Sequence, residues 1–538
     1  MTKCNACMLA CHLWKYTIEE FCLFKTLHIF SPFVFKAIKK KTQEKPGLLS
    51  NVEQLTLHTF NKGKEVWMKF VETLPNIREF YHRDVISPHT IVKSMAQLSW
   101  SRSLEKMIDQ SSKGVSNRIL SNNMCPNLTH LNMSLPGGNS ISLLKNAPAL
   151  EHITLRRGTF TFKDINMISE TLPNLKMLAL ERGVIRGNAP SSDITPAYSI
   201  TRLILASVNT HCLETTLKLL RFITVKYPNL VEFVYRLHFI PYNDEEKDTL
   251  LRMGWDPLFK NLAPLLRKLH LSQKVRTQTL FATLDEHRCQ INDLKIESFD
   301  SMDLPSFAQS QHVFYIKTLI LRNTTFESFE WLKEMKVLET LEIGSSNYRF
   351  ASELDFDDVL QNSPSTLKTL TLIDVNLNSK SASTKQTSIK TLEFFHLKLP
   401  QELSSLINQH FPLLSNLKII ECSHEIKAIT LRLVELNSFH YFMSDSKNGT
   451  HVLVHTLYDD QKRLYSRRGL YCRSNYDGYD YRENGLNPPS IKSQPADNIQ
   501  IKPAISLCCY TLLLFFRCIL SSDCYRMQFA VAHPIQHE

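Results

Sequence analysis

One short phrase recurs along the chain and limits the folds that it can adopt. The phrase is apolar-x-x-apolar-x-apolar, and residues 172–180, LPNLKMLAL, show it with Leu175, Leu178 and Leu180. Clear copies start at Val52, Ile77, Leu128, Leu150, Leu175, Ile200, Leu230, Leu266, Ile291, Ile316, Leu338, Leu367, Ile389 and Leu417. Starts lie 22 to 36 residues apart, except for one gap of 51 that a degenerate copy at Met95 divides. A weak last copy starts at Leu436. This periodicity indicates a repeat protein instead of several separate globular domains.

Each copy combines the periodicity of a strand with that of a helix. Leu178 and Leu180 are two residues apart, so both point to one face of a short strand, while Met177, Ala179 and Glu181 point to the other. Upstream segments such as 217–230 have apolar residues at three- and four-residue spacing, which is typical of a helix. A proline that stands two residues before the phrase lacks an N–H group and ends that helix. These prolines are Pro75, Pro126, Pro148, Pro173, Pro228 and Pro264.

One strand and one helix cannot bury an apolar face alone, so neighbouring copies are expected to stack into a continuous core. The predicted fold is α/β, a curved solenoid or horseshoe with a parallel sheet on its concave wall. The phrase and its step resemble leucine-rich repeats over about residues 50–440. A doubly wound α/β fold also alternates strands and helices, but it rarely exceeds about ten strands and shows no repeated phrase.

The bulk composition is that of an ordinary globular protein, with 43% hydrophobic and 21% charged residues. The formal net charge of +11 is compatible with acidic partners without selecting them. The 13 cysteines form no even framework, which favours a reducing compartment, cytoplasmic and/or nuclear. Residues 504–516 carry no charge but are shorter than the about twenty residues that span a membrane, so no membrane partner is expected.

The N-terminal segment carries a second resemblance. ACMLACHLWKYTIEEFCLFKTLHI resembles the second half of an F-box, and the residues that match are Cys7, Leu9, Cys11 and Trp14. Together with the repeats, the chain to about residue 440 resembles fungal F-box/leucine-rich-repeat proteins. The leucine-proline-glutamate helix that opens the family's F-box is missing here. The resemblance implies that these four residues form the F-box core or the surface that binds a Skp-type adaptor, which joins a cullin scaffold. The nearby cysteines and His12 lack the two separated ligand pairs of a zinc site and are expected to pack between helices.

No sequence motif points to catalysis. The chain has no GxxxxGK[ST], HExxH, GxSxG or GxGxxG phrase, so we predict that it is not an enzyme and needs no cofactor or metal. Asp355, Asp357 and Asp358 lack the glycine and ligand spacing of a calcium loop, which favours a solvated helix start.

The concave wall is the predicted binding site, because repeat proteins present an extended and rigid surface there. Its outward positions are the two x residues that flank the second apolar residue and the residue after the third. The candidate partner-binding residues are Arg83, His130, His152, Arg156, Arg236, His270, Glu342, Glu393 and Glu421. They predict a basic, histidine-rich first half and an acidic second half, which would orient an oppositely polarised protein partner. The alternative is that these are ordinary solvated strand residues.

The pattern divides the chain into four regions. We expect a partial F-box-like helical cap at 1–48, about 15 repeats at 49–442, a disordered or weakly ordered linker at 443–503, and a short apolar tail of unknown role at 504–538. Tyrosine and arginine in the linker could stack on RNA, but no RNA-binding fold accompanies them, so no nucleic-acid partner is expected.

Two functions from different classes remain. The resemblance implies a substrate-recognition subunit of an SCF-type ubiquitin ligase that holds an unknown target protein on its concave face. The alternative is a non-catalytic binding scaffold that no longer docks the adaptor.

Overall fold

The computed structural model describes most of the repeat region and short parts of the C-terminal region. The described residues are 25–29, 32–44, 47–57, 64–83, 91, 100–111, 114–135, 138–187, 194–237, 243–272, 277–297, 304–322, 328–344, 352–378, 387–399, 403–420, 422–424, 428–431, 438–442, 454–456, 504–505, 517–521 and 524–530. They belong to two compact units. Unit 1 comprises residues to Val275 with Glu286–Gln290, and unit 2 comprises Arg276–Asp285 with the residues from Ile291 onward.

Unit 1 contains a ladder of parallel strands, one from each copy of the phrase. In order, they are β1 (Thr26–Ile29), β2 (Gln54–Leu57), β3 (Glu79–His82), β4 (Lys106–Asp109), β5 (His130–Ser134), β6 (His152–Arg156), β8 (Met177–Glu181), β10 (Arg202–Val208), β11 (Glu232–Leu237) and β12 (Lys268–Leu271). The second apolar residue of each copy pairs with that of the next, as in Leu178 with Leu203. A small second sheet pairs β7 (Thr159–Thr161) with β9 (Val184–Arg186).

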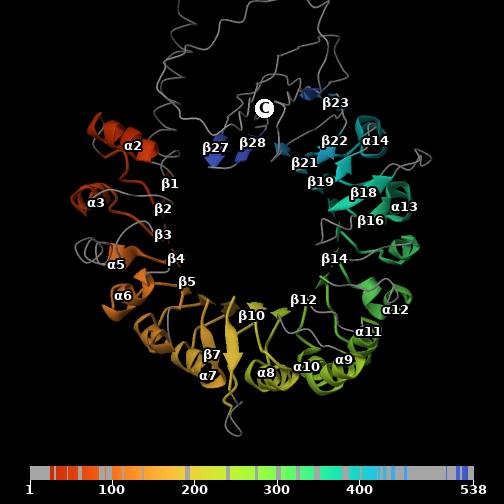
Figure 1. Cartoon of the computed structure of the whole chain (residues 1–538), viewed down its shortest axis with the longest axis horizontal. Helices are drawn as coiled ribbons and strands as arrows, with labels where there is room; N and C mark the ends of the chain where they lie inside the picture. The colour runs from red at the N-terminus through yellow and green to blue at the C-terminus, as the bar shows by residue number, and fades with distance from the viewer. Residues whose placement is uncertain are drawn as a thin grey trace, which may run out of the picture. The chain divides into compact units, whose positions relative to one another are not determined.

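The helices of unit 1 lie on one face of this sheet (Figure 1). They are α2 (Pro32–Glu44), α3 (Lys64–Val71), α5 (Trp100–Ser103), α6 (Val115–Ser121), the 3₁₀ helix η2 (Gly138–Asn146), α7 (Phe162–Thr171), α8 (Leu213–Lys226), α9 (Asp244–Leu250), the π-helical turn η3 (Leu251–Trp255) and α10 (Asp256–Leu262). Leu175, Leu178 and Leu180 are fully buried between strands and helices, as the phrase predicts. The apolar positions of the phrase therefore form the core.

Unit 2 repeats the same arrangement. Its parallel strands are β13 (Asp293–Ile296), β14 (Thr318–Arg322), β15 (Thr340–Gly344), β17 (Thr369–Ile373), β19 (Thr391–Phe395), β21 (Asn416–Ile420) and β24 (Ser438–Phe442). Its helices are α11 (Thr277–Glu286), α12 (Leu304–Gln309), η5 (Gln311–Phe314), η6 (Glu330–Glu334), α13 (Phe356–Asn362) and α14 (Leu403–His410). A second parallel sheet joins β16 (Ser352–Asp355), β18 (Val375–Asn378), β20 (Lys398–Leu399) and β22 (Ser423–His424). Asp355 caps α13 by accepting from the Asp358 N–H, which confirms the predicted helix start.

This strand-and-helix ladder confirms the predicted α/β leucine-rich-repeat fold. Its register corrects the predicted copies in three places. Met107 of β4 pairs with Phe80 and Leu131, so this copy starts at Leu104 and not at Met95. Leu417 pairs with Leu392, so the copy near residue 415 starts at Leu414. The segment LLSNLKIIEC (413–422) fits the phrase in two registers three residues apart, and only the pairing with β19 separates them.

The third correction concerns the N-terminal boundary. β1 pairs in parallel with β2, with Leu27 opposite Leu55, so the ladder begins before the predicted repeat boundary at residue 49. The FKTLHI segment has the apolar spacing of the phrase, although it falls within the region expected to form the F-box-like cap. The four residues that carry the F-box resemblance, Cys7, Leu9, Cys11 and Trp14, lie outside the described residues.

The C-terminal region adds strands to unit 2. β27 (Arg517–Ser521) and β28 (Cys524–Ala530) form an antiparallel hairpin, and β28 pairs with β24. The tail, whose role the sequence left unknown, thus covers an edge strand that would otherwise offer unpaired backbone groups. A separate parallel sheet joins β23 (Ala428–Leu431) to β25 (Val454–Thr456) and β26 (Ala504–Ile505). Among the described residues, no helix combines the length and apolar character needed to span a bilayer.

Candidate binding surface on the repeat strands

The open face of each sheet is the candidate site, and we call it the wall. The wall consists of the outward side chains of the parallel strands, at the third, fifth and seventh positions of each copy. Burial alternates along the strands, as in β14, where Leu319 and Leu321 are buried and Thr318, Ile320 and Arg322 are partly exposed. Helices cover the other face (Figure 1). The register therefore aligns the outward side chains of successive copies in rows across each sheet.

The row of third-position side chains that includes Glu79 contains Lys106, which the sequence prediction missed. Lys106 lies 3.3 Å from the Glu79 carboxylate and 5.4 Å from the centre of the Tyr81 ring. Tyr81 donates a hydrogen bond of 2.9 Å to Glu79. The contact with Tyr81 raises the pKa of Lys106, and burial raises the pKa of the Tyr81 hydroxyl. The prediction missed Lys106 because the copy was placed at Met95 instead of Leu104.

The next two members of this row are His130 and His152, which the structure brings together. Their rings stack at a centroid distance of 4.3 Å and an angle of 10°. Burial lowers the pKa of both imidazoles, and the charge of Lys106 lowers that of His130 further. A histidine with a lowered pKa is neutral near pH 7. The pair therefore offers stacked, polar ring surface in place of the positive charge that the sequence suggested.

The predicted arginines of unit 1 each contact another wall residue. Arg156 pairs with Glu181 at 2.8 Å. Arg83 donates to Gln110 at 2.7 Å, and the Nε–H of Arg236 donates to His270 Nε2 at 3.1 Å. A neighbouring pair joins Arg202 to Glu232, also at 2.8 Å. The basic character of this half of the wall is thus partly offset by acids on adjacent strands.

Unit 2 shows the same compensation for the predicted acidic residues. Glu342 accepts a hydrogen bond of 2.8 Å from Arg322 Nε, and Glu393 pairs with Lys418. Lys418 takes a wall position because the copy starts at Leu414. Glu421, which the incorrect register placed on the wall, lies outside the described residues. Glu342 and Glu393 therefore each form an ion pair with a basic residue of a neighbouring strand. Their role in binding stays a prediction.

One cluster in unit 1 has the residue types of a metal site. Ligand atoms of Asp256, Glu286 and His287 lie within 4.8 Å of one another. His287 Nε2 is 2.7 Å from Asp256 Oδ1, and Asp256 lies where α10 continues directly from η3. A histidine–carboxylate contact between α10 and the residue that follows α11 explains this cluster.

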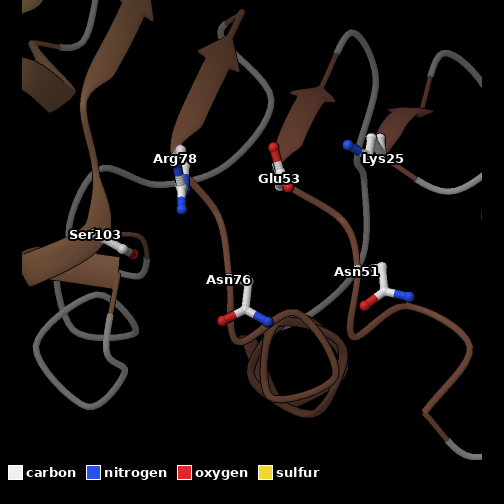
Figure 2. A pocket seen from close by; sticks show the side chains of 6 residues that line it. All are labelled: Lys25, Asn51, Glu53, Asn76, Arg78 and Ser103. Carbon is white, nitrogen blue, oxygen red and sulfur yellow. The ribbon is translucent and has the colours of Figure 1, made fainter. Parts of the chain in front are cut away.

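A polar hollow lies at the N-terminal ends of the first strands of unit 1 (Figure 2). Its volume is about 460 Å³, and Lys25, Asn51, Glu53, Asn76, Arg78 and Ser103 line it. Lys25, Glu53 and Arg78 stand at the second position of consecutive copies, so their charges alternate from strand to strand. Opposite charges at neighbouring positions offset one another, and this hollow selects no ligand charge.

Comparisons with known proteins identify no family for this chain. No protein-family model matches the sequence, and no curated protein matches it. The chain is similar to an internalin from Listeria monocytogenes, with 14% identity over 60% of this chain and 81% of the internalin, at a TM-score of 0.31. It is also similar to TLR13 in a TLR13–ssRNA13 complex, with 12% identity over 83% of this chain and 67% of TLR13, at a TM-score of 0.36. These scores are low, so the fold assignment rests on the strand register of the chain itself.

Proposed function

We propose that the wall binds a protein partner and that the chain acts as a substrate-recognition subunit of an SCF-type ubiquitin ligase. The observation that carries the binding role is the strand register, which aligns outward side chains of consecutive copies in rows on a rigid sheet. Such rows can contact an extended partner surface at many points. Ubiquitin transfer would be performed by other subunits, in the cytoplasm or nucleus.

The centre of the proposed surface in unit 1 is the histidine pair with its charged neighbours. His130 and His152 supply flat, partly buried rings. Arg156, on the same strand as His152, forms a charged pair with Glu181 on the next strand. Aromatic and arginine side chains are the residue types that contribute most at protein interfaces. The mixed charges would set the orientation of the partner more than its affinity.

The ligase role is supported by the resemblance of the N-terminal segment, and copurification tests it. The full chain would be mixed with a Skp-type adaptor and a cullin scaffold. Coelution with both supports the ligase subunit, and Trp14→Ala should weaken it. A chain that folds but does not retain the adaptor contradicts the ligase role.

The wall is tested separately by proximity labelling in cells. Arg156→Ala and His152→Ala should reduce labelling of the same partner proteins. Arg221→Ala is a matched control, because Arg221 is exposed on α8, on the helical face of unit 1. Equal labelling by all variants would contradict binding on the wall.

A second candidate function, a binding scaffold without an adaptor, is favoured by one observation. β1 pairs residue by residue with β2, so the segment just after the F-box-like residues continues the repeat sheet. In this case the N-terminal segment would cap the first repeat, as terminal repeats of solenoids require. Retained wall binding with no adaptor in the copurification would identify the scaffold.

A further inference from the structure

Large apolar side chains that are exposed concentrate in one part of the repeat. Within the described residues they are Tyr198, Val231 and Leu265 in unit 1, Phe314, Tyr315, Val337 and Leu413 in unit 2, and Val225 and Met253 on α8 and η3. The first seven all lie within two residues of the first apolar residue of a copy, where the chain turns into the strand. We call these flanking positions the rim. Among the described residues, most of the exposed large apolar side chains therefore lie at the rim, and none of them lies on the wall.

At several copies, the rim residue just before the first apolar residue is polar and donates a hydrogen bond to the backbone of the preceding copy. Asn76 donates to the Ser50 carbonyl at 2.8 Å, and Asn229 donates to the Tyr198 carbonyl at 2.9 Å. In unit 2, Thr366 donates to the Leu338 carbonyl at 2.8 Å. In these copies, the polar side chain at this position donates a hydrogen bond to the backbone of the preceding copy. The sequence phrase Pro-Asn-Leu contains this hydrogen-bond donor, with the asparagine at the rim.

Two neighbouring copies of unit 2 have apolar residues at this position instead. Tyr315 precedes Ile316 and is 46% exposed, and Val337 precedes Leu338 and is 36% exposed. Phe314, next to Tyr315, is 52% exposed. β14 and β15 are adjacent, with Thr318 opposite Thr340, so Tyr315 and Val337 occupy equivalent places on neighbouring strands. These three residues form the apolar rim patch.

The surroundings of the patch carry an excess of positive charge. Lys317 and Lys336 flank it, and both are exposed. The rim acid Glu339 pairs with Lys368 at 2.9 Å, and the charge of Lys317 also acts on it, so Lys317, Lys336 and Lys368 outnumber this one rim acid. Lys333 and Glu334, both exposed on η6, offset each other. A negatively charged ligand would therefore be attracted, and apolar groups on it could cover the three exposed side chains.

We propose that the apolar rim patch of unit 2 binds an acidic segment of a partner protein that carries aromatic or aliphatic anchors. The anchors contact Phe314, Tyr315 and Val337, and the acidic groups face Lys317 and Lys336. This surface is separate from the wall, so the proposal does not depend on the function proposed for the wall. Patches of exposed apolar residues rimmed by charge commonly mark interaction sites.

A defined peptide tests this proposal on the full chain. The probe is a fluorescein-labelled peptide in which glutamates flank two phenylalanines. Fluorescence polarisation measures its binding to the chain. Saturable binding that weakens as salt rises is expected. A peptide with lysines in place of the glutamates, and one with serines in place of the phenylalanines, should bind at least tenfold more weakly. Absence of saturable binding, or equal binding of the three peptides, overturns the proposal.

The rim offers substitutions that remove the patch without harming the fold. Tyr315→Asn and Val337→Thr install residue types that other copies have at the same position, so thermal stability should be kept. Together they should lower the affinity for the acidic peptide at least tenfold, because aromatic anchors dominate such interfaces. Lys336→Glu should also lower it, while Lys260→Glu, at an exposed lysine of α10 in unit 1, should not.

Two further measurements distinguish peptide binding at the apolar rim patch from binding at the wall and from self-association of the chain. Arg156→Ala on the wall should leave peptide binding unchanged, so the two proposals can fail independently. Sedimentation of the full chain identifies self-association. A dimer that Tyr315→Asn with Val337→Thr dissociates would overturn the proposal, because a second copy of the chain would then be the occupant of the patch.

Discussion

Replacement of Asp109 by alanine should destabilise unit 1 more than any single change on the wall. Asp109 is buried at the third apolar position of its copy. Its Oδ1 accepts from the Ser111 N–H at 3.0 Å and from the Ser111 hydroxyl. Its Oδ2 accepts from the Ser116 N–H at 2.8 Å and from the Ser116 hydroxyl at 2.9 Å. The buried His82 ring lies 3.6 Å away.

The expected loss of stability depends on the hydrogen-bond donors that lose the Asp109 carboxylate as their acceptor. Ser116 lies in the first turn of α6, whose N-cap residue, Gly114, has a left-handed φ of 64° and no side chain to cap the helix. The Asp109 carboxylate supplies that cap from the neighbouring strand. Asp109→Ala leaves four buried donors unpaired, and removal of one member of a buried charged cluster costs about 3–5 kcal/mol. Ser116→Ala removes a single hydroxyl donor and should cost about 1 kcal/mol.

The same cluster makes the effect depend on pH. Burial alone would raise the pKa of Asp109, but the contacts with His82, Ser111 and Ser116 outweigh it and hold the pKa below its ordinary value. A carboxyl with a lowered folded-state pKa contributes stability above its unfolded-state pKa of about 3.9 and loses it as the pH falls through the folded-state value. The difference between the wild type and Asp109→Ala should therefore shrink in acid.

Urea unfolding and segment-resolved hydrogen exchange measure these effects. Repeat arrays do not always unfold in one step, so protection of β4 and α6 should be followed beside the global signal. The amides of Ser111 and Ser116 should lose protection first. A change below about 0.5 kcal/mol, as for an ordinary surface substitution, would refute the assignment of Asp109 as the buried cap.

Three smaller effects are also expected. A double-mutant cycle of Arg156→Ala and Glu181→Ala should give a coupling of about 0.5–1 kcal/mol that falls with salt, and a zero coupling at low salt would mean that the pair is not formed in solution. Gly183→Ala should cost about 1–3 kcal/mol of stability and so lower the melting temperature, because a Cβ there would lie 2.7 Å from the Gly158 carbonyl oxygen. An unchanged melting temperature would contradict this contact. Asn229→Ala removes a rim hydrogen bond and should cost about 0.5–1.5 kcal/mol in urea unfolding, with no cost expected if water replaces the amide.

The wall shows why a sequence predicts positions better than interactions. His130 and His152 were placed on the wall correctly from the phrase, because alternation along a strand depends only on local geometry. Their stacking and lowered pKa depend on the burial and on the strand next to them. Arg156 and Glu342 were likewise placed correctly, but their ion pairs join residues of different copies. Charge sums along the chain could not reveal this compensation.

The order of strands and helices, the apolar core and the leucine-rich-repeat fold could all be read from the amino-acid order, since the periods of 2 and 3.6 residues and the prolines act over short distances. The register of the copies near Leu104 and Leu414, the inclusion of β1 in the sheet, and the buried Asp109 cluster required the folded chain. There the phrase fits more than one alignment or has a polar residue in an apolar place. Pairing with the adjacent strand selects the alignment that buries the apolar face, and Asp109 accepts hydrogen bonds from Ser111 and Ser116 in the folded chain.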